Sequence, residues 1–461
     1  MQRVMAMAWL TLKAAYRYKL IWVLTAILIG GVVVLPLIIK DDGTARGFTQ
    51  ILLTYTLALT TGILGFTTLW MACSTLARDV EECQIQVVAV KPIARWQIWM
   101  GKYIGIMALN ALLLTLAGTC IYFLLMSRSQ NLPEKQRELL RNEVLVARAE
   151  AREPSLEADI ERETERVFQQ RVKNNPQGNL DWKFVRSQVR EQVRAVFQVV
   201  RPGFQRVWKI NLGIAKNWLA DEPLFLRIKF NAADGKEGAT YLGLWEVGEQ
   251  TSPRLHREMM SLSADTFHEF KVPSHLLDKD GNLMITFINR NETALLFPLD
   301  DGMEVLYREG TFGLNFARGL CIILCWLSFL AAIGLAASSC LSFPVASFVA
   351  VGVLIVGFSS GTIAQVIEQG TIGAVNHETG VADQPAAIDF VALPIFNALL
   401  KLIKLVEGFS PIDALSTGCS ISWLILGQAF FQICVVLGGV ICLAGIGIFQ
   451  RRELATAQGT S

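Results

Sequence analysis

The sequence predicts an α-helical polytopic membrane protein with a large polar insert that folds outside the bilayer. Of its 461 residues 52% are apolar, and the apolar residues gather in long runs. A helix needs about 20 apolar residues to cross a hydrocarbon core of about 30 Å, and several runs reach that length. Helices buried in a soluble protein seldom stay apolar on every face over this distance. Residues 127–312 are polar instead, so we expect them to fold in water.

Six apolar runs reach the length of a membrane span. They are residues 19–39, 49–76, 103–126, 314–341, 344–367 and 421–449. The first run continues into Lys40 without a small-residue cleavage site, so it is interpreted as a retained anchor and not as a removed signal peptide. The sequence therefore predicts about six transmembrane helices, three on each side of the insert.

Lys and Arg residues near the span ends predict the orientation, because such residues are enriched in cytoplasmic loops. One basic cluster precedes the first predicted span, a second lies between spans two and three, and a third follows the last span. Their members are Arg3, Lys13, Arg17 and Lys19; Arg78, Lys91, Arg95 and Lys102; and Arg451 and Arg452. Both termini are therefore predicted to be cytoplasmic. The insert follows an odd number of crossings and is predicted to be extracytoplasmic.

The first part of the insert, residues 127–202, is predicted to be helical and heavily charged. The runs EKQRELLRNEVLVARAEAR and SLEADIERETERVFQQRVKNN alternate charge signs, as solvated helices with i to i+4 ion pairs do. A later apolar stripe at helical spacing could pack on a neighbouring helix or on a second copy of the chain. It consists of Val185, Val189, Val193, Val196, Phe197 and Val200. Acidic residues balance the basic ones and no aromatic platform is present, so we expect no nucleic-acid partner.

The second part of the insert, residues 203–312, is predicted to be an antiparallel β-sandwich of the jelly-roll type. Short apolar runs are separated by turn residues, which is the pattern of such folds. The runs are FLRIKF, TYLGLWEV, FHEFKV, NLMITFIN and ALLFPL. None of the nine cysteines lies in the insert, so packing and not disulfide bonds must stabilise it. Sugar binding, partner binding and a purely structural role all stay open for this fold.

The chain shows no pattern of a catalytic or nucleotide-binding site. His377 and Glu378 lack the second histidine of a zinc-protease helix. Gly101 and Lys102 lack the upstream glycine and the following Ser or Thr of a phosphate-binding loop. We therefore expect no catalytic residue and no cofactor in this chain.

One short match in the insert resembles the start of a calcium loop. It consists of Asp278, Asp280 and Asn282, but Asn289 stands where the loop requires a glutamate. This departure favours a tight turn between two strands over a metal site.

Residues 77–102, between spans two and three, form the most distinctive segment. The segment reads ARDVEECQIQVVAVKPIARWQIWMGK, with charge at both ends and a proline in the middle, and we expect it to be a short cytoplasmic docking element. It resembles the segment after the second span of ABC-type-2 exporter permeases, in which a charged turn is followed by Lys/Arg-Pro-Ile-x-Arg and Gly-Lys. The matching positions are Arg78, Glu81, Glu82, Lys91, Pro92, Ile93, Arg95, Gly101 and Lys102. Cys83 and Gln84 replace the small Gly-Thr pair that is usual in that family.

Both ends of the chain add to this resemblance. The tail FQRREL at 449–454 resembles the Phe-x-Arg-Arg-Asp/Glu-Leu that closes many such permeases. The run WLTLKAAYRYKL at 9–20 is similar to the family's elbow helix at the cytoplasmic membrane surface. The resemblance covers the two transmembrane parts, residues 1–126 and 313–461, and leaves the insert aside.

The resemblance implies a permease subunit of a bacterial cytoplasmic membrane that moves a substrate, in the direction of export, without catalysing a reaction. A separate cytoplasmic ABC ATPase would hydrolyse ATP, and two permease copies, or one copy and a paralogue, would form the path. Closure of the ATPase would push on the coupling residues and tilt the spans. These residues are Arg78, Glu81, Glu82, Lys91, Pro92, Arg95 and Lys102. Arg78 and Arg95 could pair with acidic groups of the ATPase, or they could act as topological anchors.

Residues 386–407 are predicted to form an interfacial or re-entrant helix and not a seventh span. Pro394 interrupts the segment, and Lys401 and Lys404 lie on its otherwise apolar sequence. A gating role at the extracytoplasmic mouth is our hypothesis for Pro394. Two other functions stay open for the whole chain. One is a force-transmitting machine linked to an ATPase, and the other is a membrane-anchored receptor or scaffold whose insert binds a partner or a glycan.

Overall fold

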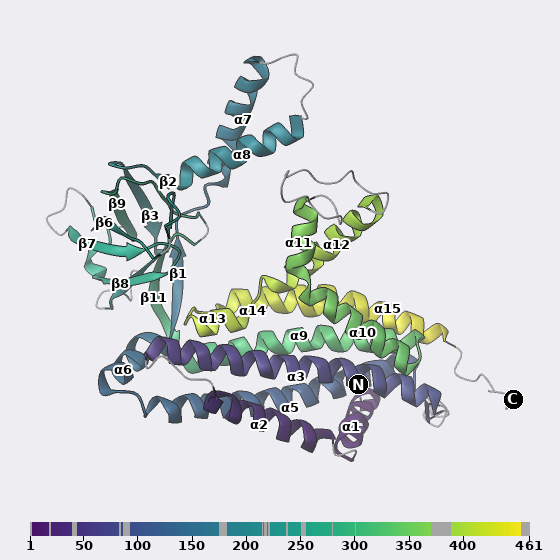
Figure 1. Ribbon diagram of the computed structural model, residues 1–461. Coiled ribbons are helices and arrows are strands. Elements are labelled where there is room, and N and C mark those ends of the chain that lie inside the picture. Colours follow the sequence, from purple (N-terminus) through teal and green to yellow (C-terminus); the bar gives the residue numbers. More distant parts are fainter. Residues whose placement is uncertain are drawn as a thin grey trace. The chain divides into compact units, whose positions relative to one another are not determined.

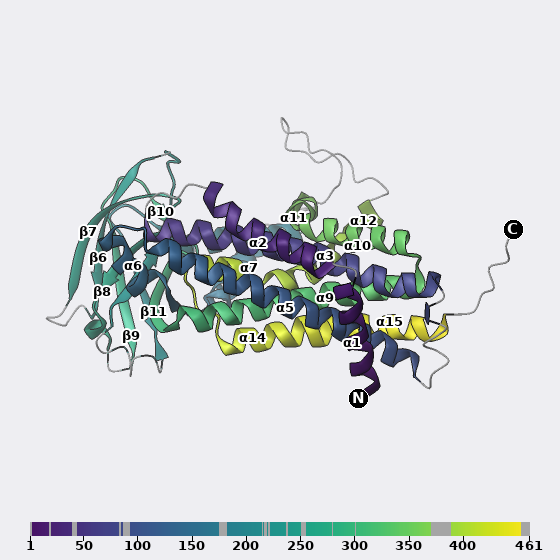
Figure 2. The same ribbon diagram turned by 90° about the horizontal axis from the view of Figure 1, so that it is seen from below.

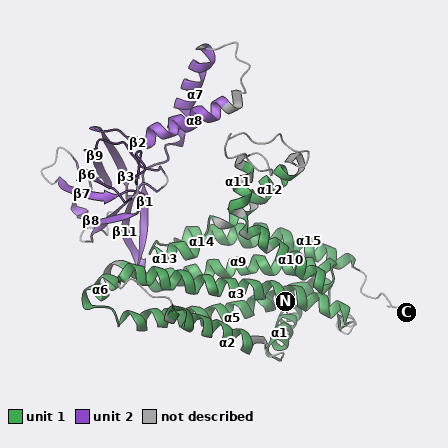
Figure 3. Cartoon of the chain, viewed as in Figure 1, with its two compact units in different colours: residues 1–146, 311–461 green, residues 147–310 purple. Residues whose placement is uncertain are grey.

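Helices and strands separate into two units along the chain. In the computed structural model, unit 1 comprises Met1–Val146 and Thr311–Ser461, and unit 2 comprises Ala147–Gly310 (Figures 1 and 3). The described residues are 2–17, 20–38, 44–82, 84–85, 93–174, 182–213, 215, 219, 222–236, 238–249, 255–278, 280–299, 301–369 and 389–452. Unit 2 covers most of the predicted insert, but residues 127–146 of that insert belong to unit 1.

Unit 1 is built from helices. Before the insert these are α1 (Gln2–Arg17), α2 (Leu20–Ile38), α3 (Ala45–Glu81), α5 (Arg95–Ser129), α6 (Glu134–Leu139) and the π-helix η1 (Leu140–Val144). After the insert they are α9 (Phe312–Cys340), α10 (Phe343–Phe358), α11 (Ser360–Gln369), α12 (Asp389–Glu407), α13 (Pro411–Ser416), α14 (Trp423–Ala429), the π-helix η4 (Phe430–Gly438) and α15 (Gly439–Arg451).

Four helices of the described residues are long and apolar enough to cross a membrane. They are Ala45–Glu81, Arg95–Ser129, Phe312–Cys340 and the continuous stretch Trp423–Arg451, which joins α14, η4 and α15. Four of the predicted spans therefore coincide with long apolar helices. Figure 2 shows these helices running side by side. These helices indicate a membrane-embedded protein.

The other two predicted spans are not reproduced as single straight helices. Residues 19–39 correspond to α2, which qualifies only when joined to α1, and the two helices are bent by 71°. Residues 344–367 break at Ser359 into α10 and α11. Gly357 and Gly361 flank this break, and glycine and serine are weak helix formers in such a position. The described residues thus contain four candidate spans, or five if the bent pair counts as one.

Helix α1 is amphipathic and packs closely on α5. Its buried face consists of Val4, Met7, Ala8, Thr11 and Ala15, while Met5, Trp9, Leu10 and Tyr16 are exposed. Two glycines of α5 allow the close approach. A Cβ atom on Gly101 would lie 2.3 Å from Met7 Cβ, and one on Gly105 would lie 2.7 Å from Thr11 Cβ.

The part of unit 2 that the structure describes contains two four-stranded sheets and one small three-stranded sheet. The first sheet has the order β1 (Val146–Arg152), β11 (Met303–Thr311), β4 (Leu224–Ile228), β8 (His268–Val272). The second has the order β3 (Gln205–Asn211), β9 (Asn282–Asn289), β6 (Thr240–Val247), β7 (His256–Ser263). The small sheet pairs β2 (Val199–Val200), β10 (Leu295–Leu296) and β5 (Asn231–Ala232), and a 3-10 turn, η3 (Ser274–Leu276), follows β8.

The two large sheets have the strand order of a jelly roll. Apart from the β6–β7 hairpin, successive long strands alternate between the sheets, which is the double Greek-key arrangement. The sheets share one apolar core that contains Leu226 of β4, Val305 of β11 and Trp245 of β6. Trp245 lies 4.6 Å from the Phe287 ring, which in turn lies 5.0 Å from the Phe297 ring. This arrangement agrees with the antiparallel β domain expected from the sequence.

The predicted boundary between a helical part and a β part of the insert is wrong. Residues 146–152 are not helical but form the edge strand β1 of the first sheet. The helices α7 (Glu157–Asn174) and α8 (Trp182–Gln198) are therefore an excursion between two strands of the jelly roll. They pack on one another through Ile160, Val189 and Val193, so the apolar stripe covers a neighbouring helix.

Candidate functional site

The predicted coupling residues gather at one end of unit 1, where α3 ends and α5 begins. Helix α3 ends at Glu81 and α5 begins at Arg95, and α10 and the end of α15 also reach this end of the helices (Figure 1). Lys91 and Pro92 lie outside the described residues. The other predicted positions, from Arg78 to Lys102, can be placed.

Arg78 and Glu81 both hold the start of α10 against the end of α3. The guanidinium of Arg78 lies 4.7 Å from the centre of the Phe343 ring, a cation–π distance. The backbone N–H of Phe343 donates a hydrogen bond to Glu81 Oε1 at 2.8 Å. This N–H belongs to the first turn of α10, where backbone donors have no partner in their own helix. Trp70 completes the contact with an edge-on approach to the Phe343 ring at 5.3 Å.

Lys102 joins α3 to α5 inside the helix bundle. Its ammonium forms an ion pair with Asp79 and donates a hydrogen bond to the Thr75 carbonyl at 2.6 Å. Only 5% of Lys102 is exposed, so it offers no surface for a partner protein. A buried charge needs such a partner because desolvation of an unpaired ammonium is costly. Lys102 is therefore an internal link between α3 and α5 and not a surface residue.

Arg95 links the start of α5 to the end of α15. Its Nη1 donates to the carbonyl oxygens of Gln450 and Arg452, both at 2.7 Å. Arg452 continues the chain of contacts, because its Nη1 donates to the carbonyls of Ser338 and Ser339 near the end of α9. Trp99 of α5 donates to Ser339 Oγ at 3.1 Å. The ends of α9 and α15 and the start of α5 thus form one hydrogen-bonded assembly.

A few residues at this end face outward. Glu82 is exposed and accepts a hydrogen bond from the Gln84 amide at 2.6 Å. Trp96, one residue into α5, is 44% exposed. Arg78 and Glu81 are exposed as well. A partner at this end would therefore meet an exposed acidic and basic surface with one indole ring.

Sequence reasoning did not identify two members of this assembly. Asp79 was passed over although it stands next to Arg78, and a carboxylate at a span end requires a cation. Phe343 lies between the predicted runs 314–341 and 344–367 and belongs to neither, although it contacts both Arg78 and Glu81. No pattern in the sequence pairs Phe343 with the end of a helix more than 250 residues earlier.

Two side-chain hydrogen bonds cross helix interfaces inside the bundle, while other buried polar atoms there, such as Asn110 Nδ2 and Trp326 Nε1, have no partner among the described residues. Asn110, buried in α5, accepts a hydrogen bond from Thr68 Oγ1 of α3 at 3.1 Å. Tyr103 and Ser328 share a hydrogen bond of 2.6 Å between α5 and α9. Such pairs cross helix interfaces and satisfy groups that hydrocarbon would leave unpaired.

Two further sequence predictions concern loops. Pro394 lies within α12 and is exposed; α12 occupies most of the segment predicted as an interfacial helix. In unit 2, Asp278 Oδ1 accepts from the backbone N–H groups of Asp280 and Asn282, both at 2.8 Å. These bonds make the tight turn that was favoured over a calcium loop. Among the residues that the structure describes, no group of three His, Cys, Asp or Glu side chains could hold a metal ion.

Comparison of the chain with known protein families, with curated proteins and with solved structures finds no match.

Proposed function

We propose that the chain is the membrane subunit of an ATP-driven exporter of the ABC-type-2 kind. In this proposal a separate cytoplasmic ATPase hydrolyses ATP, and two permease subunits form the substrate path in a bacterial cytoplasmic membrane. The finer topology, with six spans and both termini inside, belongs to this proposal. The chain itself contributes no catalytic group.

The observation that carries the proposal is the joining of several helix ends around one short exposed connection. Glu81 ties α3 to α10, Lys102 ties α3 to α5, and Arg95 ties α5 to α15. Force applied between Glu82 and Arg95 would therefore reach several helices together, since each is bonded to the next. Rigid-body tilting of packed helices is a common form of conformational change.

Helix α1 supports the same proposal. It exposes Trp9 and Tyr16 beside Arg3, Lys13 and Arg17, while its other face packs on α5. Aromatic and basic side chains on one helix are typical of a helix that lies at the membrane surface. In the proposed orientation this surface is the cytoplasmic one, where the ATPase would bind.

Co-purification from the native membrane tests the proposal. The wild-type chain should bring down a nucleotide-binding subunit with ATPase activity. Glu82→Arg should lose this partner, because Glu82 is exposed and its side chain bonds only to Gln84 among the described residues. Glu138→Arg is the matched control, since it is an equal charge change on exposed α6, beside the start of α3, and should keep the partner. Absence of any ATPase from the wild-type preparation would refute the proposal.

A second candidate function is force transmission to the outside without transport. The specific observation that favours it is the absence of any loop residue between unit 2 and α9. Strand β11 ends at Thr311 and α9 begins at Phe312. A displacement of α9 would thus act directly on a strand of the jelly roll. Transport assays in proteoliposomes that contain the chain and its ATPase would separate the two functions, because force transmission predicts ATP hydrolysis without substrate movement.

A further inference from the structure

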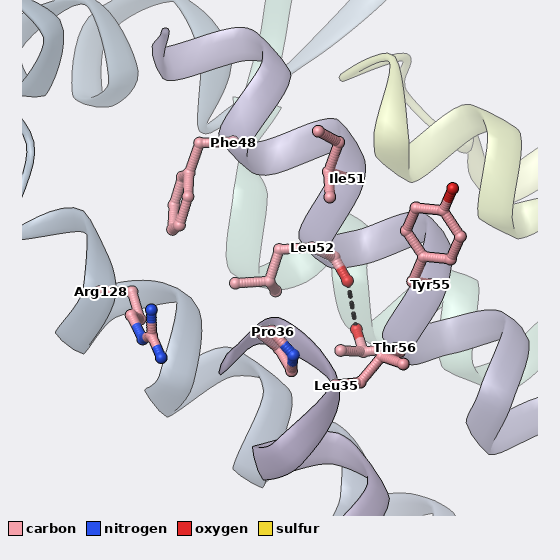
Figure 4. Close-up of a pocket in the computed structure, with 8 residues that line it drawn as sticks. All are labelled: Leu35, Pro36, Phe48, Ile51, Leu52, Tyr55, Thr56 and Arg128. Carbon is pink, nitrogen blue, oxygen red and sulfur yellow. Dashed lines mark hydrogen bonds between the residues drawn. The ribbon is translucent and has the colours of Figure 1, made fainter. Parts of the chain in front are cut away.

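A narrow cleft lies at the end of unit 1 opposite the coupling residues. It is bounded by the end of α2, the first turns of α3 and the end of α5 (Figure 4). The cleft is shallow, with a volume of about 20 Å³ available to the centre of a water-sized sphere, and the wider space of about 340 Å³ around it includes open surroundings. Phe48 and Leu52 lie one turn apart on α3, and Leu35 and Pro36 of α2 form the facing wall. An open and mostly apolar cleft of this form suits a flexible hydrocarbon chain.

The polar groups of the cleft are few, and one of them is a cation. Thr56 is already satisfied, because its hydroxyl donates to the Leu52 carbonyl at 2.6 Å. Arg128 of α5 lies beside Phe48 and Pro36 (Figure 4). Arg128 is half-buried, and no acidic side chain of the described ranges pairs with it. A guanidinium in this setting has donors for an anionic oxygen that an apolar wall cannot supply.

The position of Arg128 along α5 indicates at which level of a bilayer the cleft would lie. Helix α5 has 35 residues, and Arg128 is the last but one of them. At about 1.5 Å per residue the helix is about 52 Å long, which exceeds a hydrocarbon core of about 30 Å. A residue at its end is therefore at the level of lipid headgroups. From there Phe48 and Leu52 lead toward the middle of the span.

We propose that this cleft is a binding site for one anionic phospholipid. The phosphate accepts hydrogen bonds from Arg128, and the upper part of one acyl chain lies between Leu52 and Leu35. An anionic lipid is favoured over a zwitterionic one, because the latter carries its own cation beside the phosphate and gains less from Arg128. The site is independent of the ATPase coupling proposed above, since it uses none of the same residues.

Native mass spectrometry of the purified full-length chain tests the proposal, with phosphatidylglycerol and phosphatidylethanolamine added in separate titrations. We expect the wild type to bind phosphatidylglycerol more tightly, and Arg128→Gln to weaken that binding by about tenfold, as the loss of a charge-assisted hydrogen bond predicts. Arg128→Lys should keep most of the preference. Arg137→Gln, the same charge change on exposed α6 outside the cleft, should keep all of it.

A second variant tests the place of binding without changing the charge. Leu35→Trp adds an indole to the wall of the cleft and should also weaken phosphatidylglycerol binding, while the melting temperature shows that the chain is folded. Equal effects of Arg128→Gln and Arg137→Gln would overturn the proposal, as would equal binding of the two lipids by the wild type. Unchanged binding in a folded Leu35→Trp variant would place any lipid outside the cleft and would also overturn it.

Discussion

Arg95 at the start of α5 donates a hydrogen bond of 2.7 Å to the carbonyl oxygen of Gln450, near the end of α15. The carbonyls in the last turn of a helix have no partner in their own helix, and the helix dipole places negative charge there. An arginine from another helix supplies both the donor and the opposite charge. A residue between the second and third predicted spans is thereby joined to the last helix of unit 1.

Loss of this link should destabilise the end of α15. We expect Arg95→Gln to lower the free energy of unfolding by about 1–2 kcal/mol, the range for hydrogen bonds to a charged donor that is partly exposed. Arg95→Lys keeps the charge but loses the forked donors of the guanidinium, so its free energy of unfolding should lie between those of the wild type and the Gln variant. Thermal unfolding in detergent measures the effect. A Gln variant as stable as the wild type would show that the contact contributes nothing.

The buried pair of Lys102 and Asp79 should behave as one unit. Removal of one partner leaves a charge without compensation, and we expect Lys102→Met or Asp79→Asn alone to cost about 2–3 kcal/mol. The double variant should cost less than the sum of the two single variants, because it leaves no unpaired charge. A double-mutant cycle of unfolding midpoints provides the measurement, and strict additivity would contradict the pairing.

The close crossing of α1 and α5 should not tolerate a side chain at Gly101. A Cβ atom there would meet Met7 Cβ at 2.3 Å and the Val4 carbonyl at 3.0 Å. We expect Gly101→Ala to displace α1 and to cost about 1–3 kcal/mol. Gly62→Ala is the control, because no atom lies within 4 Å of its added Cβ and alanine is the better helix former. Protease protection of α1 should fall in the first variant alone.

The packing of α7 on α8 should depend on the buried residues of the apolar stripe of α8. Val189 is fully buried against α7, whereas Val196 on the same helix is 68% exposed. We expect Val189→Asp to cost about 3 kcal/mol or more of local stability, because it buries an unpaired carboxylate. Val196→Asp should leave the pair intact. Limited proteolysis between α7 and α8 distinguishes the two, and equal sensitivity would count against the packing described.

A hydrogen bond between Tyr241 and Asp234 should give unit 2 a defined pH range of stability. The Tyr241 hydroxyl donates to Asp234 Oδ1 at 2.5 Å. This bond lowers the pKa of Asp234 below its usual value and raises the pKa of Tyr241 to about 12. For Asp234, the folded state binds protons less readily than the unfolded state, so its stabilisation is present above pH of about 4 and is lost as pH falls further. For Tyr241, stabilisation is present below about pH 10 and is lost as pH rises toward 12.

The variant Tyr241→Phe should remove both effects together. The pKa of Asp234 should return toward its usual value, as NMR titration of the side-chain carboxyl would show. Unfolding of unit 2 in the variant should then depend less on pH at both ends of the range. An unchanged Asp234 pKa would mean that the hydrogen bond does not set it.

Apolar length was sufficient to predict the long helices but not their breaks. Four predicted spans coincide with long helices because about 20 apolar residues have few other stable arrangements. The helix breaks at Ser359 because Gly357 and Gly361 flank this position. The high apolar content of residues 344–367 gave no sign of the break. Strand β1 was missed because Ala, Arg and Glu favour helices, although Ala and charged residues alternate with period two over 147–152. Pairing with β11 decides its conformation, and that partner lies over 150 residues away.

The contacts of the candidate site residues could not be predicted from the sequence. Charge near span ends pointed to Arg78, Arg95 and Lys102, since basic residues avoid the bilayer core. Which of them would be buried depends on the neighbouring helices. Lys102 faces Asp79 and is buried, whereas Arg78 lies over Phe343 and is exposed, and no spacing in the sequence separates these two outcomes.

The neighbouring positions of β1 and β11 in one sheet have a consequence for the history and the engineering of this chain. The first and last strands of unit 2 are hydrogen-bonded to one another, so the two points at which the polypeptide enters and leaves the jelly roll are close together. A domain whose two ends are adjacent can be inserted into a host protein, or removed from it, without moving apart the two host residues that it connects. Replacement of 147–310 by a short glycine-serine bridge should therefore leave the helices free to fold, and the excised jelly roll is a module that other membrane proteins could carry.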